Sequence, residues 1–436
     1  MRTRLERYFL FAELGADWRT EILAGLTTFV TMAYIIFVNP SILHDAGMPV
    51  AAVTAATCLA SAIGCLLMGA LARYPIALAP GMGLNAYFVY SVCIGLKVPW
   101  QTALGAVFLS GVIFLILTAA GIRQLILEAI PRELYSAVAV GIGLFIAFIG
   151  FRNAGIIRAD PATLLTLGNL RSPHTLLALS GLLLIATLMA WNVRAAMLIG
   201  ILGTTLVGAL AGLVHWNPQP YSPADLSATF LQLDIPAALN LGLLEIVFVF
   251  LFVDLFDNIG TLVAVGTRAG LFDRDGHIPR VNRILTADAI ATTTGALCGT
   301  STVVSYIESA AGVVAGGRTG ITAIVCGLLF GVAVFVAPLL GVIPSAATAP
   351  ALIIVGALML SHAAEIEWSS PVVSIPAFLT LIAIPLTFSI ANGLAFGFTA
   401  HTLLRALSGE WRKVSWLVYL LTALFLLRFF YLGTAG

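Results

Sequence analysis

The sequence has few charged residues and lacks any long polar segment. Only 9% of its 436 residues are Asp, Glu, Lys or Arg, whereas 60% are hydrophobic and the mean hydropathy is +1.05. Soluble domains carry about a quarter charged residues, so this composition excludes a soluble globular protein. Apolar windows of about 20 residues, the length that crosses a bilayer as a helix, recur from position 21 to about position 406. The composition therefore predicts a multi-pass membrane protein surrounded by lipid.

Signals for disulfides, metals and secretion are also scarce. The cysteines fall in or beside apolar runs without CxxC spacing, so we expect core residues rather than disulfides: Cys58, Cys65, Cys93, Cys298 and Cys326. The histidines form no set with neighbouring Cys or Asp, so we expect no metal and no cofactor. The basic N-terminus lacks the short apolar region and cleavage site of a signal peptide. We interpret residues 1–20 as a cytosolic segment on the membrane surface.

The basic residues are distributed unevenly between the two sides of the membrane. If the N-terminus is cytoplasmic, most of them fall on the cytoplasmic side, and the other side receives Lys97, Arg152, Arg158 and Arg171. An excess of Arg and Lys marks the cytoplasmic side of membrane proteins. We therefore expect a protein of the cell (inner or plasma) membrane with a cytoplasmic N-terminus. The net charge of +1 is small, and we expect no nucleic acid partner.

Apolar runs between polar or Gly/Pro breaks form two sets of seven. The first set is 21–42, 51–72, 78–93, 101–121, 133–151, 175–192 and 195–214, and the second is 240–265, 283–299, 303–316, 319–340, 349–361, 372–388 and 390–406. A repeat with an odd number of spans enters the membrane in opposite orientations, which is the usual plan of secondary transporters. A further apolar segment, 407–436, either spans the membrane or lies at its surface.

The third run of each half is interrupted. In YPIALAPGMGLNAYFVY (74–90) prolines and glycines precede a short helical stretch, and in GTSTVVSYIESAAGVVAGG (299–317) a β-favouring stretch precedes small residues. Both patterns predict a short extended segment followed by a half-helix. Extended backbone at membrane depth needs protein or a water-filled cavity around it. Interrupted segments at matching places in two halves indicate a transport site.

Carboxylates lie inside these apolar runs. Asp254 and Asp257 are three residues apart and share one helix face, which must avoid lipid because charge there is costly. Glu308 stands where the extended segment of the tenth run becomes a half-helix, and Asn85 holds the matching place in the third run. Each also has a plain structural interpretation: bonds to neighbouring helices for the aspartates, and helix capping for Glu308 and Asn85.

Four motifs together resemble one transporter family. GMGLNAYF (81–88), LFVDLFDNIGTL (251–262), GTSTVVSYIESAAGV (299–313) with its GGRTG tail, and SIANGLAFGF (389–398) are similar to AzgA-type purine permeases. These are nucleobase–cation symporters related to the uracil transporter UraA. The resemblance extends from about Arg19 to the C-terminal run. It implies an all-α, UraA-like seven-plus-seven inverted repeat with short extended segments in spans 3 and 10.

The resemblance also implies domains and a function. The core domain would comprise 21–121 (spans 1–4) and 240–340 (spans 8–11), and the gate domain 133–214 (spans 5–7) and 349–406 (spans 12–14), with the site between them at mid-membrane. The implied activity is proton-driven import of hypoxanthine, guanine or adenine, with protons favoured over sodium. Span 12 reads APALIIVGALM instead of the QxxxPxxxG signature of the nucleobase–ascorbate branch, which argues against uracil or xanthine. The number of protomers is open, with a homodimer as one candidate.

By motif position the resemblance implies roles for four residues: Asp254, Asp257, Glu308 and Asn85. We add Tyr306, Ser309 and Thr28 as further candidate substrate-binding residues. The coupled proton is expected on Asp254 or Glu308. Because Asp254 lies nearer mid-span, we expect it to reach the ligand and Asp257 to organise the site. For Thr28, a bond to its own helix backbone is the plain alternative.

Three other functions are compatible with parts of the pattern. A membrane-embedded enzyme could use Asp254 and Asp257 as metal ligands, but it would need a second acidic cluster and basic residues for a diphosphate. A sulfate-type anion transporter shares the architecture but has little use for buried acids. A channel is disfavoured because no pore loop is repeated in the sequence.

Overall fold

The computed structural model describes residues 2–121, 130–214, 227–240, 244–269, 278–336 and 343–432. By packing, the chain divides into two compact units: Met1–Ala119 with Gly150–Ala351, and Ala120–Ile149 with Leu352–Gly436. Among the described residues, six helices are long and apolar enough to cross a membrane by length and composition. Five shorter apolar helices accompany them.

The first half of the chain contains the first seven predicted spans. Its elements are α1 (Arg2–Tyr8), α2 (Phe11–Leu14), α3 (Trp18–Met32), α4 (Ile35–His44), α5 (Val50–Leu67) with a π-helical turn (Met68–Ala72), β1 (Leu78–Pro80), α6 (Met82–Ala86) with a π-helical continuation (Tyr87–Gly95), α7 (Trp100–Ala119), α9 (Arg132–Asn153), β2 (Ile157–Asp160), β3 (Leu164–Leu167), α10 (Pro173–Ala190) and α11 (Ala196–Leu210). The antiparallel hairpin of β2 and β3 was not predicted. Its turn is stabilised by Asp160, whose carboxylate accepts bonds from the backbone N–H groups of Ala162 and Thr163.

The second half follows the same order. Its elements are α13 (Ile235–Ala238), α14 (Leu244–Ala269), α15 (Val281–Cys298), β4 (Val303–Ser305), α16 (Ser309–Val314), α17 (Gly320–Val336), α18 (Ser345–Met359) with a 3₁₀ turn (Leu360–Glu365), α19 (Pro371–Thr387), α20 (Ile390–Leu407), a 3₁₀ turn (Trp411–Lys413) and α21 (Trp416–Leu432). Each of the fourteen predicted runs contains a helix, and runs 3 and 10 contain a strand as well. The predicted fold class is confirmed.

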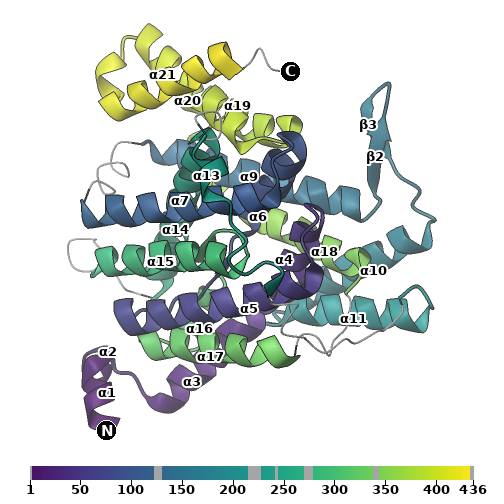
Figure 1. Cartoon of the computed structure of the whole chain (residues 1–436), viewed down its shortest axis with the longest axis vertical. Helices are drawn as coiled ribbons and strands as arrows, with labels where there is room; N and C mark the ends of the chain where they lie inside the picture. Colours follow the sequence, from purple (N-terminus) through teal and green to yellow (C-terminus); the bar gives the residue numbers. More distant parts are fainter. Residues whose placement is uncertain are drawn as a thin grey trace. The chain divides into compact units, whose positions relative to one another are not determined.

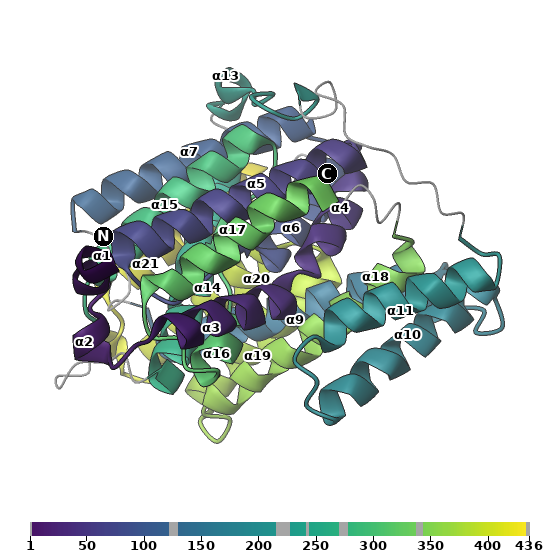
Figure 2. The same cartoon turned by 90° about the horizontal axis from the view of Figure 1, so that it is seen from below.

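Small residues let the helices of the first unit approach closely. Figures 1 and 2 show α5 beside α15 and α17, and the tertiary contacts agree. A methyl group added at Gly69 would lie 2.5 Å from the carbonyl oxygen of Gly320, so only glycine fits at this crossing. Without a hydrophobic driving force between helices in lipid, such close backbone packing is a main source of helix association.

Both halves contain a sharp break between their last two spans. Asn192 (φ 57°) separates α10 from α11, and Phe388 (φ 51°) separates α19 from α20. Ser389 then caps α20 by accepting a bond from the backbone N–H of Asn392. The matching position of these breaks agrees with the internal similarity expected of an inverted repeat. In the second unit α21 packs along α20, with the hydroxyls of Thr402 and Thr422 2.7 Å apart.

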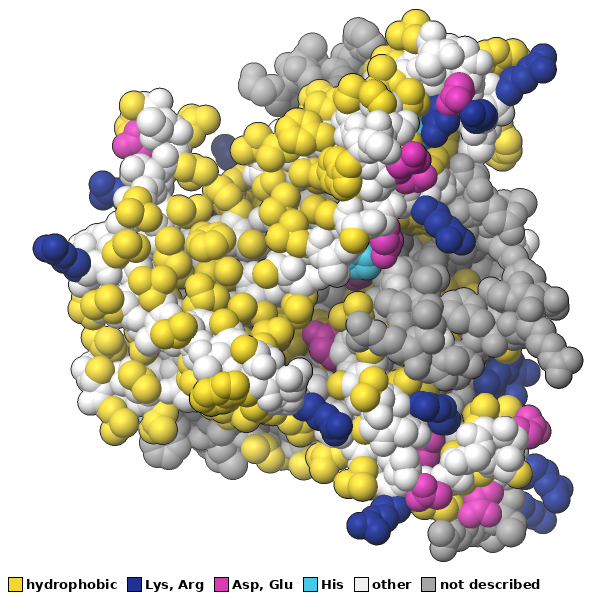
Figure 3. Space-filling view, turned by 180° about the vertical axis from the view of Figure 1, so that it is seen from behind, with side chains coloured by type: hydrophobic (Ala, Val, Ile, Leu, Met, Phe, Trp, Pro, Cys, Tyr) yellow, Lys and Arg dark blue, Asp and Glu magenta, His cyan; other side chains and the backbone are white. Residues whose placement is uncertain are grey.

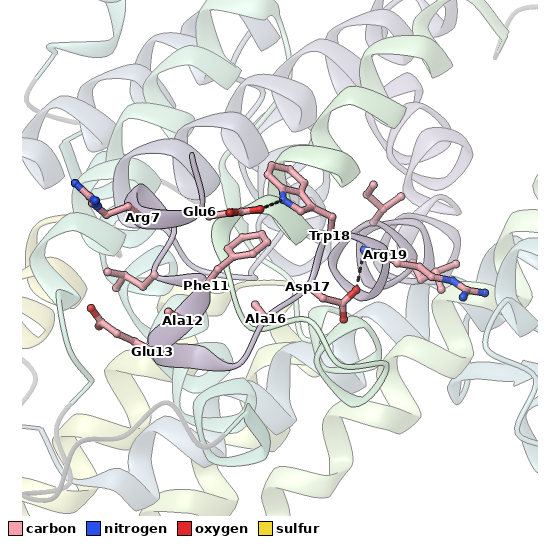
Figure 4. A pocket seen from close by; sticks show the side chains of 12 residues that line it. Glu6, Arg7, Phe11, Ala12, Glu13, Ala16, Asp17, Trp18 and Arg19 are labelled. Atoms are coloured by element: carbon pink, nitrogen blue, oxygen red, sulfur yellow. Dashed lines mark hydrogen bonds between the residues drawn. The ribbon is translucent and has the colours of Figure 1, made fainter. Parts of the chain in front are cut away.

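The surface is suited to a lipid environment. Figure 3 shows a broad area of hydrophobic side chains, with many of the visible charged side chains along its margins. Near the N-terminus a hollow of about 1000 Å³ lies between α1, α2 and the start of α3 (Figure 4), where the indole of Trp18 donates to Glu6. None of the predicted site residues lines this hollow.

Candidate functional site

The two predicted extended segments pair with each other. Strands β1 and β4 are antiparallel, with Leu78 opposite Ser305 and Pro80 opposite Val303. The pairing is extended at both ends by backbone bonds from Gly81 N to Thr302 O (2.9 Å) and from Tyr306 N to Ala77 O (3.0 Å). Each strand thus satisfies the backbone of the other at membrane depth, as such segments require. Because the pairing is antiparallel, the half-helices that follow, α6 and α16, leave from opposite ends of this short strand pair.

Tyr306 and Ser309 stabilise this crossing. The Tyr306 hydroxyl donates to the carbonyl oxygen of Pro80, and the Ser309 hydroxyl accepts a bond from the backbone N–H of Ala77 at 3.0 Å. Both side chains are buried. Their observed contacts are therefore with the opposite broken span, and their predicted substrate contacts stay predictions.

Glu308 and Asp257 lie near each other beside the strand pair. Glu308 occupies the N-cap position of α16, yet its side chain makes no capping bond. Instead it accepts a hydrogen bond of 2.6 Å from the hydroxyl of Tyr34. The carboxylate of Asp257 interacts electrostatically with Glu308 and Tyr306, and both acids are half-buried. Like charges at this proximity repel, and a proton or a ligand with N–H donors between them relieves that repulsion.

Asp254 has different surroundings, although it is three residues from Asp257. It is 1% exposed, and one oxygen accepts a bond from the amide of Asn258 (3.0 Å). The other oxygen lies 3.3 Å from the hydroxyl of Thr292, whose single proton has a closer acceptor in the carbonyl oxygen of Val303 (2.9 Å). The same Asn258 amide donates to Asp288 on α15, and its oxygen accepts from the backbone N–H of Ser305 (2.9 Å). This network joins α14, α15 and β4.

These contacts favour roles for the two aspartates that differ from our expectation. We expected Asp254 to reach the ligand and Asp257 to organise the site. In the structure Asp254 is the residue bonded to the organising network, and Asp257 is the residue beside Glu308. Because no ligand contact is observed for either aspartate, the predicted division of roles between Asp254 and Asp257 stays a prediction.

Asn85 belongs to a second buried network. Its amide nitrogen donates to Asn39, and its amide oxygen accepts from the hydroxyl of Ser301. Asn39 in turn donates to Thr57 (2.7 Å) and Thr300 (2.9 Å). Asn85 and Asn39 are fully buried, so these bonds connect spans 1, 2 and 3 with the start of span 10.

Thr28 packs against the half-helix that carries Glu308. Its hydroxyl bonds to the carbonyl oxygen of Ala24 in its own helix at 3.0 Å. A methyl group added at Gly312 of α16 would overlap the Thr28 hydroxyl and lie 2.8 Å from the oxygen of Ala24. Thr28 thus makes the bond to its own helix backbone that we gave as the alternative to substrate binding. Its packing against Gly312 sets how closely α3 and α16 approach.

Five residues that stabilise the site were not singled out from the sequence: Glu21, Tyr34, Asn39, Asp288 and Thr292. Glu21 is fully buried and accepts bonds of 2.6–3.2 Å from the backbone N–H groups of Arg318, Thr319 and Thr322 and from the Thr322 hydroxyl. It therefore caps α17. A polar side chain inside an apolar run was the available signal for Asn39 and Asp288. Tyr34 and Thr292 had none.

The site contains carboxylates, amides and hydroxyls. In the described part of the chain, no group of three or more His, Cys, Asp or Glu residues is arranged to hold a metal ion. Two of the six histidines, His215 and His277, lie outside the described residues. The arrangement can accept hydrogen bonds from a flat, N–H-rich ligand and can bind a proton.

Comparison with known proteins identifies the family. Residues 19–396 match the model described as "Permease family" (Xan_ur_permease). The guanine/hypoxanthine permease PbuG of Bacillus subtilis is 47% identical over 440 residues, covering 98% of this chain and all of PbuG. The adenine permease AdeP of Escherichia coli is 44% identical over 424 residues, covering 97% of this chain and 95% of AdeP.

The fold recurs in a solved structure of low sequence identity. The transmembrane domain of the cyanobacterial bicarbonate transporter BicA matches with a TM-score of 0.66 and 16% identity, over 87% of this chain and 97% of that one. This likeness concerns the fold alone. The family match and the relatives are permeases, so the protein is a multi-pass membrane transporter and not an enzyme. The chain belongs to the Permease family.

Proposed function

We propose that this protein imports purine nucleobases, namely hypoxanthine, guanine and adenine, by proton symport. Relatives over 40% identical along nearly the whole chain are named as guanine/hypoxanthine or adenine permeases. The membrane would be the cell (inner or plasma) membrane, with the N-terminus in the cytoplasm. The basic residues follow that orientation.

One observation carries the proposal. Two half-buried carboxylates, Asp257 of α14 and Glu308 at the start of α16, come from elements that pack against each other beside the crossing of the two broken spans, and their charges interact. Hypoxanthine and guanine carry an N–H donor on each ring, and adenine carries one ring N–H and an exocyclic amine, so each of these purines can donate to two acceptors at once. A hydrogen bond to a charged group contributes about 1.5–3 kcal/mol. Two such bonds are enough to orient a ligand of this size.

The residue roles follow from the contacts. Glu308 and Asp257 bind the purine, with Glu308 as the first candidate for carrying the proton. Asp254 and Asn85 act through the networks that fix α14 and the strand pair. Proton carriage by Asp254 is the alternative that the resemblance allows.

The division into core and gate domains is part of the same proposal. In it, the strand pair and the acids belong to the core (21–121 and 240–340), and the gate (133–214 and 349–406) moves against it. The packing units described above divide the chain at other positions. The core and gate therefore rest on the resemblance and on the positions of the site residues.

Anion transport is the rival function for this fold. BicA, whose transmembrane domain has the same fold, is a bicarbonate transporter. Here two carboxylates stand at the crossing of the broken spans, and their charge would repel an anion. A neutral purine that donates hydrogen bonds suits them better.

Uptake by cells lacking their own purine permeases tests the proposal. Radiolabelled hypoxanthine, guanine, adenine and uracil are supplied with and without a protonophore. We expect accumulation of at least one purine, little uracil, and loss of accumulation with the protonophore. Accumulation of none of the three purines would refute purine transport, and accumulation that persists with the protonophore but follows a sodium gradient would refute proton coupling.

A further inference from the structure

We propose that Tyr34 is a positioning residue that holds the carboxylate of Glu308 for the ligand. This inference rests on the proposed function, because it assigns a task within the same site. The sequence gives no hint of it, since Tyr34 and Glu308 are 274 residues apart. What carries it is a direct side-chain bond together with the packing around it.

Tyr34 occupies the turn between α3 and α4. Helix α3 ends at Met32 and α4 begins at Ile35. The backbone N–H of Phe37 bonds to the Tyr34 carbonyl at 3.1 Å, an i to i+3 bond that tightens this turn. The Tyr34 side chain is 1% exposed, and its hydroxyl donates to Oε1 of Glu308 at 2.6 Å. A buried phenol normally finds such a partner, and here the partner is an acid of the site.

The bond is one end of a line of contacts between α3 and α16, which lie side by side in Figure 2. Near the start of α3, the side chain of Thr20 packs so closely against Gly316 that a methyl group added at Gly316 would overlap it. Further along, Thr28 packs in the same way against Gly312. At the far end, Tyr34 meets Glu308. The half-helix α16 thus packs along α3, and the side chain of its N-cap residue, Glu308, is held by the Tyr34 hydroxyl.

The loop after α16 is anchored as well. Glu21 of α3 accepts the backbone N–H of Arg318 at 2.8 Å. The guanidinium of Arg318 donates to the carbonyl oxygens of Val313 (2.7 Å) and Gly317 (2.9 Å). Because these contacts hold both ends of α16, the backbone of Glu308 is held in place and mainly its side chain can rotate. The Tyr34 bond restricts that rotation.

The consequence for binding is pre-organisation. Tyr34 bonds to Oε1, and no other side chain in the described part of the chain bonds to the Glu308 carboxylate, so we assign Oε2 to the ligand donor. Without the hydroxyl, the ligand must order the carboxylate itself, and that cost lowers affinity. The loss of one hydrogen bond to a charged group predicts a roughly tenfold weaker purine affinity in Tyr34→Phe.

A double-mutant cycle separates positioning from general packing. Hypoxanthine binding is measured on the purified full chain as wild type, Tyr34→Phe, Glu308→Gln and the double variant. If Tyr34 acts through Glu308, Tyr34→Phe weakens binding roughly tenfold in the wild type but much less when Glu308 is already changed. Equal factors in both backgrounds would overturn the proposal. Glu308→Asp, which keeps the charge but withdraws it from Tyr34, replaces Glu308→Gln if binding becomes too weak to titrate.

A matched variant controls for the loss of a buried hydroxyl. Tyr74 is also buried, and its hydroxyl donates to the carbonyl oxygen of Pro279 at 2.7 Å. Tyr74→Phe should leave hypoxanthine affinity unchanged. An equal loss of affinity in both variants would mean that any missing hydroxyl has this effect, and it would overturn the specific role of Tyr34.

A measurement made without ligand tests the role of Tyr34 independently of purine transport. A hydrophobic carbodiimide modifies buried carboxyl groups, and mass spectrometry of the peptide containing Glu308 gives the rate. We expect Glu308 to react several-fold faster in Tyr34→Phe than in the wild type, because the hydroxyl no longer covers Oε1. Equal rates would overturn the positioning role. Absence of purine binding in the wild type, with this rate difference present, would refute the proposed function alone.

Discussion

At the scale of single residues, the carboxylates of α14 differ in what they contact. Asp254 is buried, with one oxygen bonded to the amide of Asn258 and the other 3.3 Å from the Thr292 hydroxyl, whereas Asp257 is half-buried beside Glu308. Replacing the Asp254 carboxylate by an amide brings a buried NH₂ group into this network, because an amide presents only one oxygen. Replacing a carboxylate that faces the ligand removes attraction without disturbing packing.

Asp254→Asn should therefore mainly reduce stability, whereas Asp257→Asn should mainly weaken purine binding. We expect Asp254→Asn to lower the unfolding temperature, since a buried donor left unpaired costs about 1–3 kcal/mol. Asp257→Asn should keep the wild-type unfolding temperature and weaken purine binding by roughly ten- to a hundredfold. Thermal unfolding and binding are measured on both purified variants. Wild-type affinity in Asp257→Asn would remove Asp257 from the site.

Asn85→Ala should act mainly through stability. The change removes the donor to Asn39 and the acceptor for Ser301, and both partners are buried. We expect a loss of about 1–3 kcal/mol of stability, together with a higher substrate concentration for half-maximal uptake because the start of span 10 is displaced. Detergent-solubilised unfolding curves and uptake kinetics check this. Weaker uptake with unchanged stability would instead indicate a direct contact between Asn85 and the purine.

At the scale of elements, the close packing of α16 against α3 depends on a glycine, Gly312. A methyl group at Gly312 would overlap the hydroxyl of Thr28 and approach the backbone oxygen of Ala24. The Thr28 side chain can give way, but the backbone oxygen cannot do so without moving the helix. Glu308 directly precedes the first residue of α16, so any shift of this helix moves the Glu308 carboxylate.

Gly312→Ala should consequently impair both folding and binding. Overpacking of this kind costs about 1–3 kcal/mol, and we expect purine affinity to fall as well. Gly331→Ala is the matched control, since a methyl group at Gly331 in α17 meets no atom within 4 Å and alanine favours a helix. Binding and unfolding temperature are compared in the two variants. Wild-type behaviour of Gly312→Ala would contradict the close packing of α3 and α16.

Local sequence pattern predicted the elements but not their partners. Proline, glycine and β-branched residues were sufficient to locate the two extended segments and the half-helices, because these residues act on their own backbone. The pairing of β1 with β4, the bond of Tyr34 to Glu308 and the bridge from Asn258 to Asp288 join residues distant in the sequence. Such contacts depend on the packed fold. The polar residues of the broken spans could therefore be named in advance, whereas the residues that they contact could not.

At the scale of the whole molecule, acids in the connecting segments should not determine the pH dependence of transport. The side chain and backbone of Thr20 donate to Asp17 and lower the pKa of this carboxyl. Bonds from Lys413 and Arg405 lower the pKa of Glu410 in the same way. A lowered pKa in the folded state means that the stabilising contribution is present above the unfolded pKa and is lost only as the pH falls through the folded value. Both groups therefore stay ionised from about pH 5 to 8.

Asp17→Asn and Glu410→Gln should each leave the pH profile of uptake unchanged. Initial uptake of hypoxanthine is measured across about pH 5 to 8, a range above the ordinary pKa of both carboxyls. Glu308→Gln, measured in parallel, should transport too little to give a profile. A flattened profile in either loop variant would place the pH-sensitive group outside the spans.

The central claim is that Glu308 binds a purine whose transport is driven by protons. Its most direct test uses purified protein in liposomes with an acidic exterior, supplied with radiolabelled hypoxanthine, guanine or adenine. Wild type should accumulate at least one of them above the external concentration, and collapse of the pH gradient should release it. Glu308→Gln, reconstituted in equal amount, should show no accumulation. Accumulation by Glu308→Gln equal to that of the wild type would contradict the account.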